Sequence, residues 1–313
     1  MLAREILVLA GPTAVGKSSL AVDVAQAVDA EIVSADSRQL YRGLDVGTAT
    51  PTDSERRGVL HHLLDVLDPD EPVDAGWYQR RALAAIGDCR LRGRPVVVVG
   101  GSTLYVHALV EGLADLPSVP SETERQLAAE LAEPGGPARL YRELAAADPE
   151  AAATLDPSKS QRLLRLLGLT RTAPGQVSGA WSRQSPPPVA SRLVILDRPR
   201  PELYARIEAR VDGMVASGLR RELDTALDRW PGALDTLRST IGYRELLAVR
   251  NGETTLERAV ETIKRNSRRY AKRQLTWYRR YPEATWLDAS SATADDVLRA
   301  VAPWPGTDSG PRR

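Results

Sequence analysis

The stretch that decides the fold is Gly11-Pro12-Thr13-Ala14-Val15-Gly16-Lys17-Ser18. It follows an apolar run at 6–10 and precedes a segment, 19–25, with helical spacing of apolar residues. G-x-x-x-x-G-K-S between a strand and a helix is the pattern of the phosphate-binding loop. The glycines let backbone N–H groups surround an anion, and the positive end of the following helix points at the same place. With the charge of Lys17, and a Ser18 hydroxyl suited to Mg²⁺, the stretch predicts a site for a diphosphate or triphosphate.

Composition places the chain among ordinary globular proteins. Of its 313 residues 42% are hydrophobic and 27% are charged. Cys89 is the only cysteine, which excludes an intramolecular disulfide and a multi-cysteine zinc site. We find no signal-peptide pattern and no apolar run near the roughly 20 residues that span a bilayer. We therefore expect a cytoplasmic protein that does not enter a membrane.

Short apolar runs alternate with helical patterns along the chain. Residues 31–35, 96–99 and 192–196 are predicted strands, and 286–288 is a candidate for a last short one. This alternation predicts an α/β fold with a doubly wound parallel sheet. Ligands bind such sheets at the carboxyl ends of the strands. We therefore expect the loop at 11–18, the segment Asp36–Gln39 and the segment Gly100–Ser102 to meet in one crevice.

A region rich in Leu, Ala and Glu interrupts this alternation. Between 117 and 190 the helical segments 122–132, 138–147 and 161–167 are separated and flanked by Pro- and Gly-rich connectors. The expected organisation is given by four ranges: 1–116 as the first part of a phosphate-loop core, 117–190 as a helical insertion, 191–302 as the completion of the core with basic C-terminal helices, and 303–313 as a disordered tail.

Asp36 stands out because it ends a predicted buried strand close to the phosphate loop. A carboxylate there could bind Mg²⁺ or accept a proton from a nucleophile, and it could also cap a turn. The strand at 96–99 ends in Gly100-Gly101-Ser102 rather than in the aspartate of a Walker B motif. That difference argues against an NTP-hydrolysing motor, although ATP or GTP is the expected occupant on the loop motif alone.

A basic segment near the C-terminus points to a polyanionic partner. Between 264 and 280 there are eight cations and no acid, interleaved with Tyr270, Trp277 and Tyr278. Such a segment is either a solvated helix face with aromatic anchors or a surface that binds phosphate backbones; we favour nucleic acid. The neighbouring His61 and His62 lack a third ligand at zinc spacing, so we expect structural roles for them.

Together, these motifs resemble one family, the bacterial tRNA dimethylallyltransferases (tRNA isopentenyltransferases). The matching stretches are GPTAVGKSSLA at 11–21, SADSRQLYRGLDVGTATP at 34–51, HHLLDVLDPDEP at 61–72, VVVGGSTLYVHALVEGL at 97–113, LYARIEARVDGMVASGL at 203–219, IGYREL at 241–246 and AKRQLTWYRRYPEATWLD at 271–288. The resemblance implies a phosphate-loop NTPase-like core with a helical insertion. It also implies transfer of the dimethylallyl group from dimethylallyl diphosphate to the exocyclic amine of the adenosine 3′ of the anticodon (position 37) in tRNA, with Mg²⁺ as cofactor.

The resemblance assigns roles residue by residue. It implies catalytic roles for Asp36 (as base), Lys17, Arg206 and Ser102, and a place for Ser18 at Mg²⁺. The implied tRNA contacts are Asp36, Ser37, Arg38, Gln39, Ser102, Arg125, Gln161, Arg162, Leu163, Leu164, Arg165, Gly242, Tyr243, Arg244, Lys272 and Arg273. Ser102 stands where the family has threonine and keeps the hydroxyl. The segment 157–168 lacks the family's Asn, Asp and first Arg, so the insertion's contacts depart most from the pattern.

Three other readings compete with a tRNA prenyltransferase, for which we expect a monomer. A small-molecule kinase would share the phosphate loop but would not need the basic segment. An isopentenyltransferase acting on free adenosine phosphates would share the core. A non-catalytic RNA-binding protein would not need Lys17, Ser18 and Asp36 together.

Overall fold

The computed structural model describes residues 5–114, 116–117, 119–156, 159–172 and 186–304. The described residues fall into two compact units: those within 1–110 and 187–313 form one, and those within 111–186 form the other. The insertion predicted at 117–190 overlaps the second unit, whose range is 111–186, and the predicted tail lies almost entirely outside the described residues. In the described part of the chain, no helix combines the length and apolarity needed to cross a membrane.

The first unit is built on a six-stranded sheet in the order β3-β2-β4-β1-β5-β6. Every pairing in it is parallel. The strands are β1 (Ile6–Ala10), β2 (Glu31–Ser34), β3 (His61–His62), β4 (Val96–Gly100), β5 (Ser191–Asp197) and β6 (Thr285–Asp288). The predicted α/β fold is therefore confirmed. The two-residue strand β3 was not predicted, because two residues carry no measurable alternation of apolar and polar side chains.

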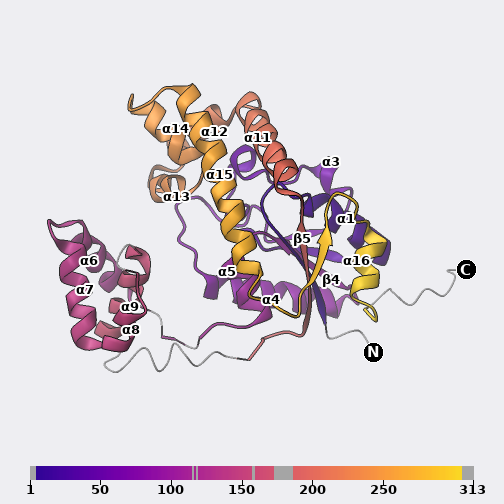
Figure 1. Cartoon of the computed structure of the whole chain (residues 1–313), viewed down its shortest axis with the longest axis horizontal. Helices are drawn as coiled ribbons and strands as arrows, with labels where there is room; N and C mark the ends of the chain where they lie inside the picture. The colour runs from indigo at the N-terminus through magenta and orange to yellow at the C-terminus, as the bar shows by residue number, and fades with distance from the viewer. Residues whose placement is uncertain (1–4, 115, 118, 157–158, 173–185, 305–313) are drawn as a thin grey trace, which may run out of the picture. The chain divides into compact units, whose positions relative to one another are not determined.

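Helices cover both faces of this sheet, and alternate residues of each strand face opposite layers. Leu7 and Leu9 of β1 pack with α1 (Lys17–Val28) and α16 (Ala294–Ala300), whereas Ile6 and Val8 pack with α4 (Ala75–Leu91) and α5 (Thr103–Val110). The strands β1 and β4 are buried throughout, as expected for a parallel sheet enclosed by helices. Figure 1 shows this layering around the sheet.

A group of helices follows β5 and completes the first unit. These are α11 (Arg200–Ala216), α12 (Leu219–Arg229), α13 (Leu234–Ser239), α14 (Tyr243–Arg250) and the 23-residue α15 (Leu256–Tyr278), with a short 3₁₀ turn at Pro231–Ala233. Thr255 caps α15 by accepting a hydrogen bond from the Arg258 N–H. The helix α15 packs along α11 and α14 and reaches the sheet through Ala271 and Tyr278. Its buried face carries the apolar and aromatic residues of the basic segment.

The second unit is helical and has a core of its own. Its helices are α6 (Ser121–Ala132), α7 (Gly136–Ala147), α8 (Pro149–Ala153) and α9 (Ser160–Thr172). Leucines from α6, α7 and α9, among them Leu127, Leu140 and Leu167, are fully buried together. On the outside, Arg171 donates hydrogen bonds to both Glu130 and Glu143. Helical segments were predicted here, and the five-residue α8 was not.

Candidate active site

The loop between β1 and α1 has the backbone that its sequence predicts. Gly11 and Gly16 have φ of 147° and 111°, values that glycine adopts without strain. A Cβ on Gly11 would lie 2.5 Å from the carbonyl oxygen of Leu196 in β5, so the loop closes tightly against the end of that strand. Gly16 leads directly into α1, whose first residue is Lys17. The N–H groups of the loop and helix therefore form a concave, positively polarised surface.

Lys17 lies at the centre of this surface, half-buried. Its Nζ donates a hydrogen bond to the carbonyl oxygen of Pro12, 2.6 Å away. Burial lowers the pKa of Lys17 to about 7, with Asp36 opposing this effect and Arg210 adding to it. An anion in the loop would raise that pKa again, because it stabilises the ammonium form.

Asp36 follows β2 and is partly buried. One oxygen of its carboxylate accepts a hydrogen bond from the N–H of Arg38 at 2.9 Å, so the predicted turn cap is present. Its negative charge also acts on Lys17 and Arg210. Since a carboxylate has two oxygens and several lone pairs, capping a turn with one oxygen leaves Asp36 able to accept a proton.

Ser102 holds the end of β4 against the Asp36 turn. Its buried Oγ accepts a hydrogen bond from the N–H of Ser37 at 2.8 Å and donates one to the Ser37 hydroxyl at 3.1 Å. The Ser102 N–H donates to the carbonyl oxygen of Ala35. Through these contacts Ser102 fixes the position of the backbone on both sides of Asp36.

Gln274 of α15, which the sequence analysis did not single out, joins the two glycine-rich loops. Its Oε1 accepts the N–H of Thr13 at 2.9 Å, and its Nε2 donates to the carbonyl oxygen of Gly101 at 2.6 Å. The side chain is 2% exposed, and a Cβ on Gly101 would lie 2.5 Å from its amide nitrogen. In the sequence, Gln274 is one polar residue inside a basic helical segment. Its hydrogen-bond partners lie up to 261 residues away, so no local pattern indicates them.

Two arginines of α11 reach the phosphate loop. The predicted Arg206 donates from Nε to the carbonyl oxygen of Ala14 at 2.9 Å. Arg210, one helical turn later, donates to the hydroxyl of Thr13 at 3.2 Å and to the carbonyl oxygen of Thr48 at 3.1 Å. Burial lowers the pKa of Arg210, and Asp36 opposes that shift. Arg210 was not predicted, although its i, i+4 spacing from Arg206 was visible.

The segment after Asp36 is fixed by contacts from distant helices. Gln39 donates to the carbonyl oxygen of Ala49 at 3.0 Å, at the end of α2 (Asp45–Thr48) and before α3 (Asp53–Arg56). Glu222 of α12 accepts the N–H groups of Val46 and Gly47 at 2.7 and 2.8 Å, and also the hydroxyl of Tyr243 at 2.5 Å. A Cβ on Gly47 would lie 2.4 Å from the Tyr243 ring. The Tyr243 side chain is fully buried, so an RNA contact at this position would have to use its backbone.

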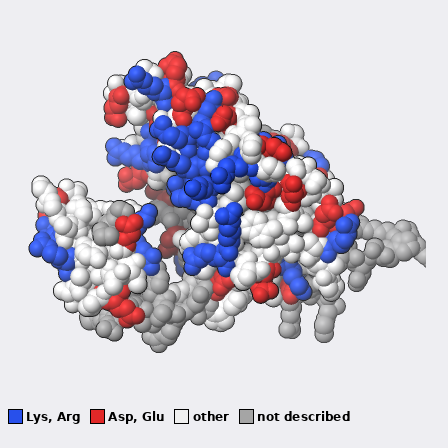
Figure 2. All heavy atoms as spheres, in the orientation of Figure 1, with Lys and Arg blue, Asp and Glu red and all other residues white. Residues whose placement is uncertain are grey.

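The basic segment forms an exposed row of cations on α15. Arg265, Arg269, Lys272 and Arg273 are exposed, and Arg279 and Arg280 follow at the end of the helix. Figure 2 shows lysines and arginines gathered on this side of the first unit. Lys264 and Arg268 instead pair with Asp212 and Glu208 of α11. The predicted separation of a cationic face from a buried aromatic face is therefore present.

The residues predicted in the second unit differ in exposure. Gln161 and Arg162 are exposed on α9, whereas Leu163 is buried in the core of the unit and Leu164 is half-buried. Arg165 donates to the carbonyl oxygen of Pro117, and Arg125 pairs with Glu122 at 2.6 Å. The side chain of Leu163 is therefore unavailable to RNA, and contacts from its polar neighbours stay predictions.

The donor groups in the crevice fit a phosphate-bound Mg²⁺. Ser18 is exposed on the first turn of α1, next to the loop that would hold the phosphates. A neutral hydroxyl oxygen, supplemented by phosphate oxygens and water, suits Mg²⁺.

A separate cluster of Glu31, His62 and Cys89 has ligand atoms within 4.8 Å of one another. Arg92 donates to both oxygens of that glutamate, so the cluster is a hydrogen-bonded network around a paired carboxylate.

A model of the family described as IPP transferase matches residues 39–281. The chain belongs to the IPP transferase family. Among the curated relatives of this IPP transferase, the tRNA dimethylallyltransferase of Salinibacter ruber is 43% identical over 297 residues, which cover 95% of this chain and 91% of the relative. The Chlorobium limicola protein of the same name is also 43% identical, covering 95% and 96% of the two chains.

Solved structures agree with this family assignment. The full-length tRNA isopentenylpyrophosphate transferase of Bacillus halodurans is 35% identical, with a TM-score of 0.69 and coverage of 95% and 94% of the two chains. A eukaryotic dimethylallyltransferase acting on tRNA is 26% identical with a TM-score of 0.77, covering 92% of this IPP transferase and 74% of that chain. The predicted family is therefore confirmed.

Proposed function

We propose that this chain transfers the dimethylallyl group of dimethylallyl diphosphate to the N6 amine of the adenosine at position 37, beside the anticodon of tRNA. It is a prenyltransferase by family. The observation that carries the proposed reaction is the position of Asp36, whose carboxylate shares the crevice with Lys17 and Arg210 at the phosphate loop. One site would therefore hold the leaving diphosphate, through Lys17 and Arg210, and the proton acceptor, Asp36.

The loop, Lys17, Arg206 and Arg210 would bind the diphosphate of the donor. In the reaction, the adenine N6 forms a bond to the allylic carbon, while the bond from that carbon to the diphosphate oxygen breaks. Negative charge grows on the departing diphosphate, and preorganised N–H groups and cations stabilise that charge. Ser18 would hold Mg²⁺, which when bound supplies further neutralisation of the diphosphate charge.

Asp36 would take the proton from the attacking amine. The lone pair of an adenine amine is delocalised into the ring, so the amine is a weak nucleophile, and removing its proton as the bond forms lowers the barrier. Ser102 supports this step by fixing the Asp36 turn through Ser37. Gln39 lies on the same segment and is the proposed contact for the adenine or its neighbour.

The substrate adenosine must leave its stack to reach this crevice. The exposed cations of α15 would bind the phosphate backbone of the tRNA, with further contacts proposed from Arg38, Gly242, Arg244, Lys272 and Arg273 and, in the second unit, from Arg125, Gln161, Arg162 and Arg165. We propose that the enzyme acts as a monomer in the cytoplasm.

The test is an assay of the purified protein with dimethylallyl diphosphate, Mg²⁺ and unmodified tRNA. Mass spectrometry of the digested tRNA should detect isopentenyladenosine, and diphosphate should accumulate in equal amount. Two further reactions contain AMP as the acceptor, or ATP in place of the prenyl donor. Prenylation of AMP without prenylation of tRNA, or phosphoryl transfer from ATP, would replace the proposal with one of its rivals.

A further inference from the structure

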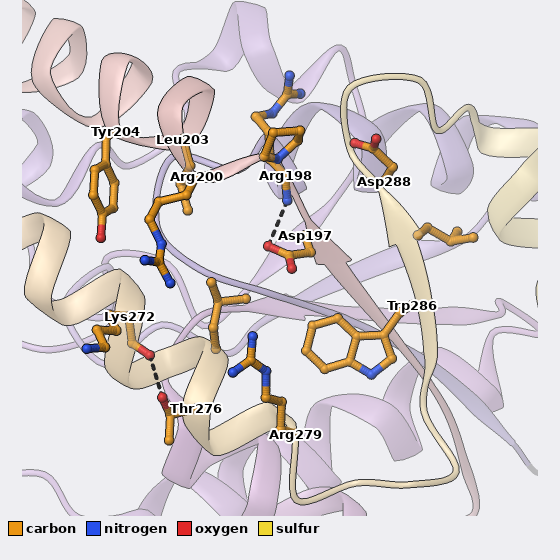
Figure 3. A pocket seen from close by; sticks show the side chains of 13 residues that line it. Asp197, Arg198, Arg200, Leu203, Tyr204, Lys272, Thr276, Arg279, Trp286 and Asp288 are labelled. Carbon is orange, nitrogen blue, oxygen red and sulfur yellow. Dashed lines mark hydrogen bonds between the residues drawn. The ribbon is translucent and has the colours of Figure 1, made fainter.

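A pocket lies away from the phosphate loop, at the carboxyl ends of β5 and β6. It has a volume of about 450 Å³, within the roughly 300–1,000 Å³ of ligand pockets. Its walls come from the start of α11, the second half of α15 and the edge strand β6. Figure 3 shows Arg200 and Arg279 extending into the space that Trp286 borders.

The wall of the pocket carries more positive than negative charge. Among the described residues, Arg200, Lys272 and Arg279 form no ion pair. The two acids in the wall are already engaged: Asp197 accepts the N–H of Arg198, and Asp288 accepts the N–H and hydroxyl of Ser290. Both carboxylates keep their charge in these hydrogen bonds, and Arg198 pairs with Glu202, so three unpaired cations face two acids in the wall. The excess of positive charge favours a bound anion.

The pocket also offers an aromatic surface. Trp286 is one of the few large hydrophobic side chains that are exposed in the described structure, whereas the next residue of this edge strand, Leu287, is partly buried against the core. An indole beside cations suits a base attached to a phosphate, because bases stack on aromatic rings while arginine and lysine bind the phosphate. A free phosphate would not use the indole.

The pocket continues the cationic face of α15. Lys272, Thr276 and Arg279 belong both to its wall and, at 3–4 residue spacing, to the row that begins at Arg265 and Arg269. We infer that the pocket is a nucleotide subsite for the RNA substrate, which binds one phosphate through Arg200 and Arg279 and stacks its base on Trp286. A free nucleotide has the same chemistry; the continuous row of cations favours an RNA chain. This inference rests on the proposed function for the identity of the RNA.

The experiment measures the affinity for unmodified tRNA, without prenyl donor, by filter binding from 50 to 300 mM salt. R200Q/R279Q should weaken binding about tenfold at physiological salt and reduce the slope of log affinity against log salt by about 1.5. W286A should weaken binding at least about fivefold, and W286F, which can still stack, should restore most of the loss. The matched control R94Q/R192Q removes two exposed arginines at the amino ends of the strands, and we expect its effect to be small.

A second arm separates the two sources of the nucleotide. AMP is titrated against the wild type and W286F, with tryptophan fluorescence as the readout. Quenching by AMP combined with unchanged tRNA affinity in R200Q/R279Q would overturn the assignment to RNA. Equal losses of tRNA affinity in R200Q/R279Q and R94Q/R192Q would also overturn it, because the effect would then be one of net charge.

Failure of the reaction and failure of the subsite are distinguishable. If the wild type prenylates tRNA, the pocket variants should raise KM for tRNA while kcat and KM for dimethylallyl diphosphate stay unchanged. If the wild type transfers no prenyl group, the binding measurements still decide whether the pocket holds RNA.

Discussion

Asp36 caps a turn with one carboxylate oxygen, and its charge acts on Lys17 of the phosphate loop. The D36N variant can still accept the Arg38 N–H through its amide oxygen, but it is a far weaker proton acceptor. We expect kcat to fall about 10²–10⁴-fold, the usual contribution of a general base, with tRNA affinity nearly unchanged. Single-turnover kinetics and filter binding on the same preparation check this. A parallel loss of affinity would identify Asp36 as a binding residue instead.

Lys17 makes the binding of the prenyl donor dependent on pH. Its pKa of about 7 in the free protein means that most molecules carry a neutral amine at pH 8. A bound diphosphate favours the ammonium form, so binding at pH 8 should take up close to one proton, and at pH 6 almost none. The affinity for dimethylallyl diphosphate should therefore fall as pH rises above 7.

Calorimetry in buffers of different ionisation enthalpy measures this proton uptake, with dimethylallyl diphosphate as the only ligand. The K17R variant is the control, because a guanidinium stays protonated throughout this range. Identical proton uptake in K17R and the wild type would assign the proton to another group.

At the scale of secondary-structure elements, Gln274 of α15 links the loop after β1 to the loop after β4. Replacing Gln274 with leucine removes the hydrogen bonds to Thr13 and Gly101 and leaves both backbone groups without their partner. We expect Q274L to lose about 2 kcal/mol of unfolding free energy and to bind the prenyl donor more weakly. Urea denaturation measures the first effect. The exposed Gln26 provides the control variant Q26L, and equal denaturation midpoints for the two variants would contradict the assigned role.

We expect the outer face of α15 to affect the affinity for RNA and not the stability of the fold. Arg265 and Arg269 are exposed and form no ion pair with a described acid. The variant R265Q/R269Q should bind tRNA more weakly and show a salt dependence shallower by about 1.5 in slope. Binding measured across a salt series checks this, again beside R94Q/R192Q. An unchanged slope would mean that this face does not contact phosphates.

At the scale of the whole molecule, the two units have separate hydrophobic cores and should lose structure separately. Arg171 joins Glu130 of α6 to Glu143 of α7 in the second unit. In R171M, amide hydrogen exchange should accelerate several-fold in α6, α7 and α9 and stay unchanged in β1 and β4. R139M, which removes a more exposed ion pair with Glu133 and a longer contact with Glu130, is the comparison variant. Faster exchange in the sheet of R171M would contradict separate stability.

Features encoded within a few neighbouring residues were predictable from the sequence. The apolar runs predicted β1, β4 and β5, and the loop motif predicted the turn at Gly16 and the helix that begins at Lys17. Gln274, Arg210 and Glu222 were missed for one physical reason, since each acts on backbone groups or hydroxyls more than 160 residues away. The pocket at Trp286 combines three segments, and only the basic segment of α15 carries a pattern that predicts an anionic ligand.

The contact between Gly47 and Tyr243 has a consequence for how such sequences can diverge. A Cβ at 47 would overlap the tyrosine ring. The hydroxyl of that ring and the backbone N–H groups at 46 and 47 all donate to Glu222. A substitution at any one of 47, 222 and 243 alone should therefore lower the stability of the fold. Drift at 243 toward a smaller residue would open room for a side chain at 47. In a large set of related sequences, the amino acids at 47, 222 and 243 should therefore be statistically coupled across their distance along the chain.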